Sequence, residues 1–531
     1  FKPIGTELVP SEDQNRFIVN VICPVGVSID YVDEMLKKGE DVMIGLKDPQ
    51  TDTEVVASMF AAVSIRPGSL ISEGTLFVRL VPADQRGWTQ SDVMNATREG
   101  LAAIPGMRAV VLDLSTQGFT PSRGYPVDFA VQGPDWKTVT ELSERIKEAM
   151  IDSGLVTDVN SDYRPGMPEV RLAPDREKAA ELGIPMQRLA FTLNVAFGGV
   201  RNGRFTELDK RYDVRLRLQE QQRSSPYQLE SLYVKNDAGK LVPLSDVCNW
   251  KTVSTLPVIN RYNHLRKVEI TANMAPGVSQ GEAIARCHDI AEEVRDEMEL
   301  PPSYRIVQLG NAQAMKDTLT SLWWALALGF VVAGMILGVQ FNSFVHPFTV
   351  LIAVPFGVTG ALAMLWISRL WGPPDTLNLM SMIGMVLLAG LVKKNSIILI
   401  DYTNLLRAQG MGLKEAVLKA CPIRLRPILM TSLATIAAAV PMALGFGPGA
   451  ETRAPLARSI IGGIFLSTLV TLVIVPIFYC LFDRFGDWVR GLTRRTEDAP
   501  RCLEEHEENT NGQPSSNGQT RPVRPVVVST T

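Results

Sequence analysis

The sequence has few of the side chains that bind metals or build disulfide frameworks. Its 531 residues include six cysteines and four histidines, and no two cysteines have the CxxC spacing. These residues are Cys23, Cys248, Cys287, Cys421, Cys480, Cys502, His264, His288, His346 and His506. Structural zinc sites need such ligands in closely spaced pairs. The sequence therefore predicts no resident metal or other cofactor, and it leaves the disulfide state of Cys23, Cys248 and Cys287 open.

Motifs for catalysis and for nucleic-acid binding are also missing. No nucleophile elbow, phosphate-binding loop or metal-ligand motif occurs, which disfavours an enzyme. The net charge of −3 gives no electrostatic reason to expect a nucleic-acid partner. The sequence also lacks an initiating methionine and a signal peptide, and it begins at Phe1 in mid-pattern. We interpret it as a fragment or as one half of a larger system.

Charged residues are almost absent from one long part of the chain. Residues 1–315 carry charges throughout and resemble a soluble α/β protein, whereas residues 319–482 contain long apolar runs. Residues 484–531 are polar and rich in Asn, Gln, Pro, Ser and Thr, which predicts a disordered tail.

The apolar part predicts five membrane spans. A spanning helix needs about 20 mostly apolar residues. Any one such segment could instead be a buried helix of a soluble protein, but five in succession make that interpretation poor. The predicted spans are residues 321–339, 347–368, 377–402, 427–446 and 459–482.

Lysine and arginine near the span ends predict the orientation, because these residues concentrate on the cytoplasmic side. They follow the third and fifth spans, as Arg407, Lys414, Lys419, Arg424, Arg426, Arg484, Arg490, Arg494 and Arg495. With an odd number of spans, residues 1–315 then lie on the opposite side, the periplasm of a Gram-negative cell, and the tail is cytoplasmic. Arg453 and Arg458, between the fourth and fifth spans, count against this orientation.

The soluble part repeats the order strand, helix, strand. Alternating apolar runs such as residues 17–25 and 125–133 flank segments of helical spacing such as 28–43 and 135–154. Residues 164–255 break this pattern with short helices and hairpin-like strands. The predicted fold class is therefore a membrane α-helical bundle with α+β subdomains of split βαβ type and one inserted subdomain.

The segment GLVKKNSIILIDY, residues 390–402, places charges inside the third span. A charge at the bilayer centre costs about 2.5–3.5 kcal/mol on insertion scales. Lys393 and Lys394 could extend their amines to the inner interface. Alternatively, one lysine points into the bundle and meets a buried carboxylate, and intramembrane ionisable residues commonly mark functional sites.

A second polar set begins the fourth span, in RLRPILMTSL. Arg424 and Thr431 are seven residues apart and share a helix face. Arg424 could also be an ordinary charge of the inner loop. Asp401 is the one candidate acidic partner in this region, and it lies near the inner end. A lysine in the bilayer core would therefore need a carboxylate from elsewhere, whose protonation would release it.

These residues carry a resemblance. GLVKKNSIILIDYTNLLR followed by EAVLKACPIRLRPILMTSL resembles the tenth and eleventh spans of the resistance-nodulation-division (RND) efflux transporters, hydrophobe and amphiphile multidrug branch. VASMFAAVS, DREKAAELGI, LNVAFGGVRNGRF, GKLVPLSDV and APGVSQGEAI match the family's patterns in the soluble part, in order. The resemblance extends from residue 1 to about residue 485.

The resemblance implies a homotrimeric, proton-driven exporter of the inner membrane, embedded in lipid, that works with a periplasmic adaptor and an outer-membrane channel. It implies the following organisation: a porter subdomain at 1–123, a second porter subdomain at 124–163 and 260–315, a docking subdomain at 164–259, a transmembrane bundle at 316–483 and a tail at 484–531.

The resemblance also implies a proton relay made by Lys394, Arg424 and Thr431. The family's paired aspartates lie in the fourth span, and this chain begins after the seventh. The N-terminal half of the transporter, on a separate chain or in a missing part, is therefore the expected partner.

The substrate cleft is marked by Phe60 and Phe77, which match positions lining the drug pocket of multidrug members. Core packing is the alternative for both. The loop after Phe60 departs from the aromatic-rich multidrug pattern, because Ile65 and Arg66 stand where aromatics are common.

Two further functions stay open. Heavy-metal export by the same family would use porter methionines, for which Met59, Met107 and Met167 are available without a distinctive spacing. A scaffold half that only assembles and docks is the other alternative, but it would have no use for the relay residues.

Overall fold

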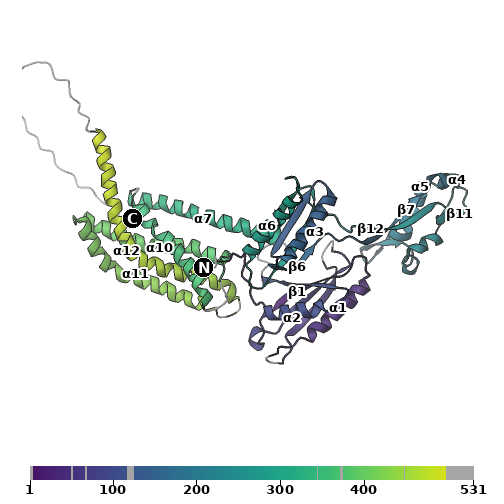
Figure 1. The fold of residues 1–531 in the computed structure, drawn as a ribbon, viewed down its shortest axis with the longest axis horizontal. Helices are drawn as coiled ribbons and strands as arrows, with labels where there is room; N and C mark the ends of the chain where they lie inside the picture. Colours follow the sequence, from purple (N-terminus) through teal and green to yellow (C-terminus); the bar gives the residue numbers. More distant parts are fainter. Residues whose placement is uncertain are drawn as a thin grey trace, which may run out of the picture.

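The computed structural model describes residues 4–49, 52–65, 69–115, 125–343, 345–370, 375–445, 447 and 449–497, with side chains as far as residue 484. The molecule is elongated (Figure 1). A helical bundle occupies one end, two sheets with their helices form the middle, and a region of short strands and helices forms the other end.

The first sheet consists of four antiparallel strands in the order β2-β3-β1-β4. Side chains alternate across a strand, so Leu76, Val78 and Leu80 of β3 all enter the core beneath the helices. Ser28 and Thr89 cap the two helices by accepting bonds from backbone N–H groups. The elements are β1 (Arg16–Ile22), α1 (Ile29–Ile44), β2 (Val56–Val63), β3 (Glu73–Leu80), η1 (Ala83–Gln85), α2 (Gln90–Ala102) and β4 (Arg108–Asp113).

The second sheet is assembled from two distant parts of the sequence. Its strand order is β13-β14-β5-β15, with β6 also paired to β14. Two helices pack on it, and Phe129, Leu142 and Ile270 lie fully buried between the layers. The elements are β5 (Val127–Gly133), α3 (Trp136–Asp152), β6 (Val156–Ser161), β13 (Arg261–Tyr262), β14 (Leu265–Met274), α6 (Gln280–Glu297) and β15 (Arg305–Gln308).

Residues 167–255 form the end farthest from the bundle (Figure 1). The antiparallel pair β7–β12 leads into this region, and a small core gathers around Leu189, Leu229 and Val234. The β8–β9 hairpin is exposed along almost its whole length. The elements are β7 (Met167–Pro174), α4 (Arg176–Glu181), α5 (Met186–Leu193), η3 (Asn194–Gly198), β8 (Val200–Glu207), β9 (Lys210–Leu216), η4 (Glu220–Gln222), η5 (Pro226–Ser231), β10 (Tyr233–Lys235), β11 (Leu241–Pro243), η6 (Leu244–Asp246) and β12 (Cys248–Thr255).

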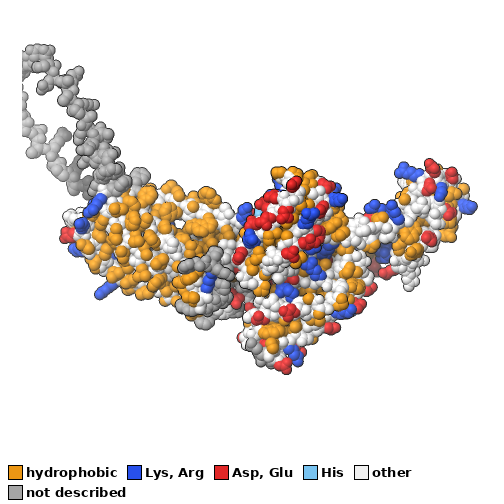
Figure 2. Space-filling view, in the orientation of Figure 1, with side chains coloured by type: hydrophobic (Ala, Val, Ile, Leu, Met, Phe, Trp, Pro, Cys, Tyr) orange, Lys and Arg blue, Asp and Glu red, His pale blue; other side chains and the backbone are white. Residues whose placement is uncertain are grey.

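Five helices are long and apolar enough to cross a membrane, within the described residues. Their surface is a nearly continuous apolar band, whereas charges cover the sheets and the far end (Figure 2). The elements are α7 (Gly310–Phe341), α8 (His346–Leu351), α9 (Ala353–Ile367), η7 (Ser368–Leu370), α10 (Leu379–Ala408), α11 (Leu413–Ala443) and α12 (Ala450–Glu497). Together α8, α9 and η7 make the second span, with a break in the helix at Ile352.

Two predicted boundaries in this part are wrong. The helix that contains the predicted fourth span does not begin at residue 427, because α11 begins at Leu413 and runs on through Pro422 and Pro427. A proline removes one backbone hydrogen bond, and packed membrane helices tolerate that loss. The tail does not begin as coil at residue 484, because α12 continues to Glu497. Residues 498–531 of the predicted tail lie outside the described residues.

Residues 4–15, the junction segment, connect the bundle to both sheets. Leu377, just before α10, donates from its backbone N–H to Gly5 at 2.8 Å and accepts from Glu7 at 3.1 Å. Leu8 is buried in the core of the second sheet. Asp13 accepts from the buried Arg86 beside the first sheet at 2.5 and 2.7 Å. The segment that precedes β1 therefore fixes the position of α10 relative to both sheets.

Three described cysteines outside the helical bundle lie far apart. Cys23, Cys248 and Cys287 are buried in three separate apolar cores, and none of the three forms a disulfide bond. Burial raises the pKa of the Cys287 thiol to about 11.

Candidate functional site

Helices α10 and α11 are joined near the middle of their length by a buried polar contact. Asn395 of α10 donates from Nδ2 to Ser432 Oγ of α11 at 3.2 Å, and Thr468 of α12 donates to the same oxygen at 3.0 Å. All three side chains are at least nine-tenths buried. In an apolar bundle such a network sets the register of the helices, because a slip would leave these polar groups unpaired.

This contact places two of the predicted relay residues at the same level. Lys394 immediately precedes Asn395, and Thr431 immediately precedes Ser432. Lys394 is exposed in this chain, and Thr431 is half-buried. The Thr431 hydroxyl donates to the backbone oxygen of Ile428 at 3.1 Å. No acidic side chain of the described residues forms an ion pair with Lys394. The lysine amine therefore lies on a face of the bundle that this chain leaves uncovered.

Arg424 lies farther toward the end where α10 meets α11. It is seven residues before Thr431, about 10 Å along a helix that rises 1.5 Å per residue. Its guanidinium carbon is 4.5 Å from the ring centroid of Tyr402 on α10. Arg424 Nε is buried and makes no hydrogen bond within the described part of the chain. The structure thus spreads the three predicted residues over two levels, with Lys394 and Thr431 at one and Arg424 at the other.

The other two charges of the opening motif differ from Lys394. Lys393 is half-buried, on a different side of α10. Asp401 is exposed next to Tyr402, and in the described residues it forms no ion pair with Arg424 or with either lysine. Asp401 therefore does not supply the carboxylate that the intramembrane lysine lacks.

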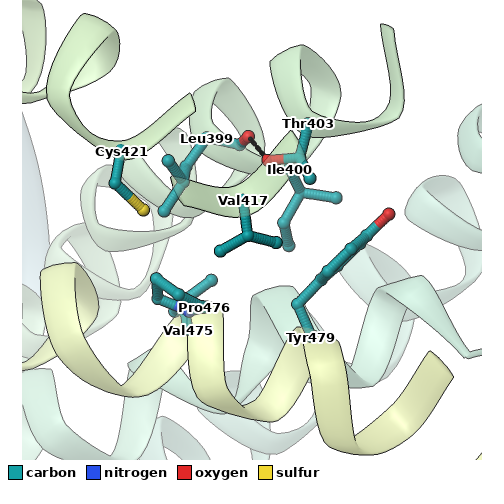
Figure 3. Close-up of a pocket in the computed structure, with 8 residues that line it drawn as sticks. All are labelled: Leu399, Ile400, Thr403, Val417, Cys421, Val475, Pro476 and Tyr479. Carbon is teal, nitrogen blue, oxygen red and sulfur yellow. Dashed lines mark hydrogen bonds between the residues drawn. The ribbon is translucent and has the colours of Figure 1, made fainter. Parts of the chain in front are cut away.

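The opposite side of α10 is apolar and closed. Figure 3 shows a small cavity between α10, α11 and α12, lined by Leu399, Ile400, Thr403, Val417, Cys421, Val475, Pro476 and Tyr479. Thr403 Oγ1 donates to the backbone oxygen of Leu399 at 2.8 Å, so its hydroxyl is satisfied within its own helix. This side of α10 is thus packed against α11 and α12 and has no unsatisfied hydroxyl at Thr403.

A second polar group, at the end of the bundle where α10 ends, was not predicted. Arg407 of α10 donates to Asp483 of α12 at 2.7 Å and to Tyr479 Oη at 3.2 Å. Tyr479 in turn donates to Asn404 Oδ1 at 2.5 Å and stacks on His346 at 5.5 Å between ring centroids. The sequence signal was available, since Arg407 and Asp483 stand at the inner ends of two predicted spans. The group fastens α8, α10 and α12 together.

Phe60 and Phe77 face each other across two neighbouring strands. They are register partners in β2 and β3, with ring centroids 6.0 Å apart and planes at 35°. Both lie on the face of the first sheet that α1 and α2 do not cover, and Phe60 is 59% exposed. Of the two residues that depart from the multidrug pattern, Ile65 is exposed, and Arg66 lies outside the described residues.

The candidate methionines do not gather into a site. Met59 and Met107 pack against the core of the first sheet, and Met167 is exposed on β7. In the part of the chain that the structure describes, no group of three or more His, Cys, Asp or Glu side chains could hold a metal ion.

Comparison with known proteins gives consistent matches. Residues 1–483 match the AcrB/AcrD/AcrF family. Multidrug resistance protein MdtC of Yersinia enterocolitica is 30% identical over 479 residues, which cover 90% of this chain and 45% of that protein. MdtC of Yersinia pseudotuberculosis is 29% identical over 479 residues, which again cover 90% of this chain and 45% of that protein. The chain thus spans about half the length of the curated relatives it matches.

Solved structures match in fold. A crystal structure of a heavy metal efflux pump superposes with a TM-score of 0.75 at 23% identity, covering 91% of this chain and 49% of that one. A second crystal form of a heavy metal efflux pump gives 0.74. At this level of identity the similarity establishes the architecture, a multi-pass helical bundle with sheet-rich subdomains, and it does not identify the cargo.

Proposed function

The chain belongs to the AcrB/AcrD/AcrF family of RND transporters, and from that premise we propose that it is the C-terminal half of a proton-driven exporter of organic and amphiphilic compounds. It is a secondary active transporter, not an enzyme, and the proton-motive force takes the place of a cofactor. The names of the MdtC relatives support the multidrug cargo.

The observation that carries this proposal is the environment of Lys394. A lysine exposed on the uncovered side of a membrane helix is costly unless another protein surface meets it. The N-terminal half of the transporter, on a separate chain or as a preceding part of the same polypeptide, supplies that surface together with the carboxylates that this chain lacks. When a carboxylate takes up a proton, it releases Lys394, and the helices can then change their packing.

Lys394, Arg424 and Thr431 form this chain's side of the proton relay. The Asn395–Ser432 bond supports the assignment, since it keeps Lys394 and Thr431 at one level while α10 and α11 move as a pair. Arg424 contributes a permanent positive charge about two helical turns farther inward.

The assembled pump is a homotrimer in the bacterial inner membrane, with residues 1–315 in the periplasm and the tail in the cytoplasm. The two sheets act as porter subdomains of split βαβ type, with Phe60 and Phe77 in the substrate cleft. Residues 164–259 dock to the adaptor and the outer-membrane channel. Their place at the end farthest from the bundle supports that role (Figure 1).

The test is Lys394→Ala in the assembled transporter, with Lys393→Ala as the matched control. Loss of the relay amine should abolish proton-driven efflux of a cationic dye and leave trimers intact on native gels. Lys393→Ala should retain efflux, because the neighbouring lysine lies on another side of α10. Efflux that survives Lys394→Ala would refute the relay and leave the scaffold function as the better explanation. Protection of cells against copper or silver, with no protection against dyes, would instead favour metal export.

A further inference from the structure

We propose that Tyr402 is a positioning residue for the relay, which holds the guanidinium of Arg424 over its ring. The inference rests on the proposed function, because it assigns a role to a neighbour of Arg424. It concerns a residue that the sequence motifs do not single out.

The geometry that supports this role is a cation–π contact between two helices. The guanidinium carbon of Arg424 is 4.5 Å from the ring centroid of Tyr402, well within the range of about 6 Å for such contacts. Tyr402 is half-buried and packs against the apolar core of the bundle, so its ring has little freedom to move. Arg424 is half-buried as well, and it forms no ion pair within the described residues.

A ring suits this position better than a carboxylate does. A carboxylate would bind the N–H groups of Arg424 and cancel its charge. An aromatic ring contacts the flat face of the guanidinium and leaves the N–H groups, which point outward in its plane, free to bind. Nε is buried without a hydrogen-bond partner in the described chain, so the ring of Tyr402 is the contact that orients this end of the guanidinium. The positive charge of Arg424 is not cancelled and stays available to the absent half.

The charged and titratable groups around this position do not provide another anchor. On the two helices in contact here, the nearest charged or titratable groups along the chain are Lys393, Lys394, Asp401 and Arg407 on α10, and Glu415, Lys419, Cys421 and Arg426 on α11. The acids among them, Asp401 and Glu415, are both exposed, and neither forms an ion pair with Arg424 in the described residues.

The expected effect is on the pH dependence of transport. A fixed positive charge near the relay carboxylates lowers the pH at which they release protons. If the ring is lost, Arg424 can swing away, and the carboxylates hold their protons up to a higher pH. The pH of half-maximal transport should then rise by about 0.5 to 1. This is smaller than the change of about 1 to 3 in a carboxyl pKa that a directly adjacent positive charge can cause, because Arg424 moves away without being removed.

The experiment measures proton-driven efflux of ethidium by the assembled transporter in proteoliposomes as a function of pH. Tyr402→Phe keeps the ring and should keep the profile of the unaltered protein. Tyr402→Leu removes the ring and should move the profile to higher pH. Replacement of Tyr402 by phenylalanines with one, two and three fluorines weakens the cation–π contact in steps at nearly constant size, and should move the profile in steps.

Two controls separate the possible failures. Phe478→Leu removes a half-buried ring of α12 whose one aromatic contact in the described residues is Phe482, at 5.6 Å between ring centroids and tilted by 41°, and it should leave the profile in place. Arg424→Ala should abolish transport if the proposed function is right. An unchanged profile in Tyr402→Leu, or an equal displacement in Tyr402→Phe, would overturn the role of the ring while leaving the relay intact. Retained transport in Arg424→Ala would instead refute the relay.

Discussion

Arg458, near the start of α12, donates from one guanidinium nitrogen to both carboxylate oxygens of Asp375, at 2.8 Å each. Its Nε also donates to the backbone oxygen of Ala443, the last residue of α11, at 3.0 Å. A single side chain thus joins α12 and the end of α11 to the segment before α10. The rule that lysine and arginine concentrate on the cytoplasmic side does not account for Arg458, which lies at the end of the bundle nearest the sheets. Its ion pair with Asp375 gives this arginine a structural role instead.

Arg458→Gln should weaken the bundle. The substitution leaves Asp375, which is 91% buried, without its cation, and loss of such a charge-assisted bond costs about 1–3 kcal/mol. We expect a lower midpoint of thermal unfolding in detergent. Arg453→Gln is the matched control, since Arg453 is exposed and its Nε donates to the backbone oxygen of Gly449, the residue just before α12. Equal midpoints for the two variants would contradict the structural role of the Arg458 pair.

Gly462→Ala should destabilise the contact between α9 and α12. A Cβ atom at Gly462 would lie 2.2 Å from Met364 Cβ and 2.5 Å from the backbone oxygen of Gly360, so the helices would have to separate. The expected loss is about 1–3 kcal/mol, as for other overpacked contacts. Gly329→Ala in α7 has open space around it and should be neutral or slightly stabilising in the same unfolding assay. If Gly462→Ala were as stable as Gly329→Ala, the close approach of α9 and α12 at Gly462 would not contribute to the stability of the bundle.

Asp128 of β5 should make the soluble part more stable in mild acid. Burial and the nearby charge of Glu269 raise the pKa of Asp128 to about 7 from an ordinary value of 3.8. The folded state therefore holds a proton that the unfolded state has lost, and stability decreases as pH rises from about 4 to about 7. The full increase in the pKa of Asp128 corresponds to a difference of about 4 kcal/mol in the free energy of unfolding between low and high pH.

The measurement for Asp128 is unfolding stability at pH 5 and pH 8. Asp128→Asn should remove most of the difference in the free energy of unfolding between pH 5 and pH 8, and it should stabilise the protein at pH 8. Asp289→Asn, an exposed residue of α6, should leave the difference unchanged. A destabilising effect of Asp128→Asn at pH 8 would mean that the carboxylate is needed in its charged form.

Phe60→Ala should weaken export of flat apolar compounds. Its ring is exposed and held against Phe77, as a stacking surface for a ligand would be. Loss of one aromatic contact of about 1 kcal/mol corresponds to roughly a fivefold rise in the substrate concentration needed for half-maximal efflux. Ile151→Ala, on the exposed side of α3, should have no effect. If Phe60→Ala left the concentration for half-maximal efflux unchanged for several dyes, the substrate cleft would not include Phe60.

Sequence patterns were sufficient for the membrane helices and for the presence of hairpin-like strands within residues 164–255. Each span is a run of apolar residues longer than a soluble core helix needs, and this property is local. The hairpin turn between β10 and β11 is likewise local, because Gly239 has a left-handed φ of +85° and Asn236 accepts from Lys240. The limits of α11 and α12 were not predictable in this way, since prolines and charges inside a helix are compensated by neighbouring helices.

By itself, the sequence determined that this chain has five apolar helices long enough to cross a membrane and that Lys394 lies in one of them, with Asp401 as the one nearby acid. Apolar length and charge along a chain are enough for both conclusions. Only the tertiary structure decided that the Asn395–Ser432 bond places Lys394 level with Thr431, and that Arg424 meets the ring of Tyr402. These relationships depend on the register between two helices, which buried polar contacts set and which spacing within one helix cannot reveal.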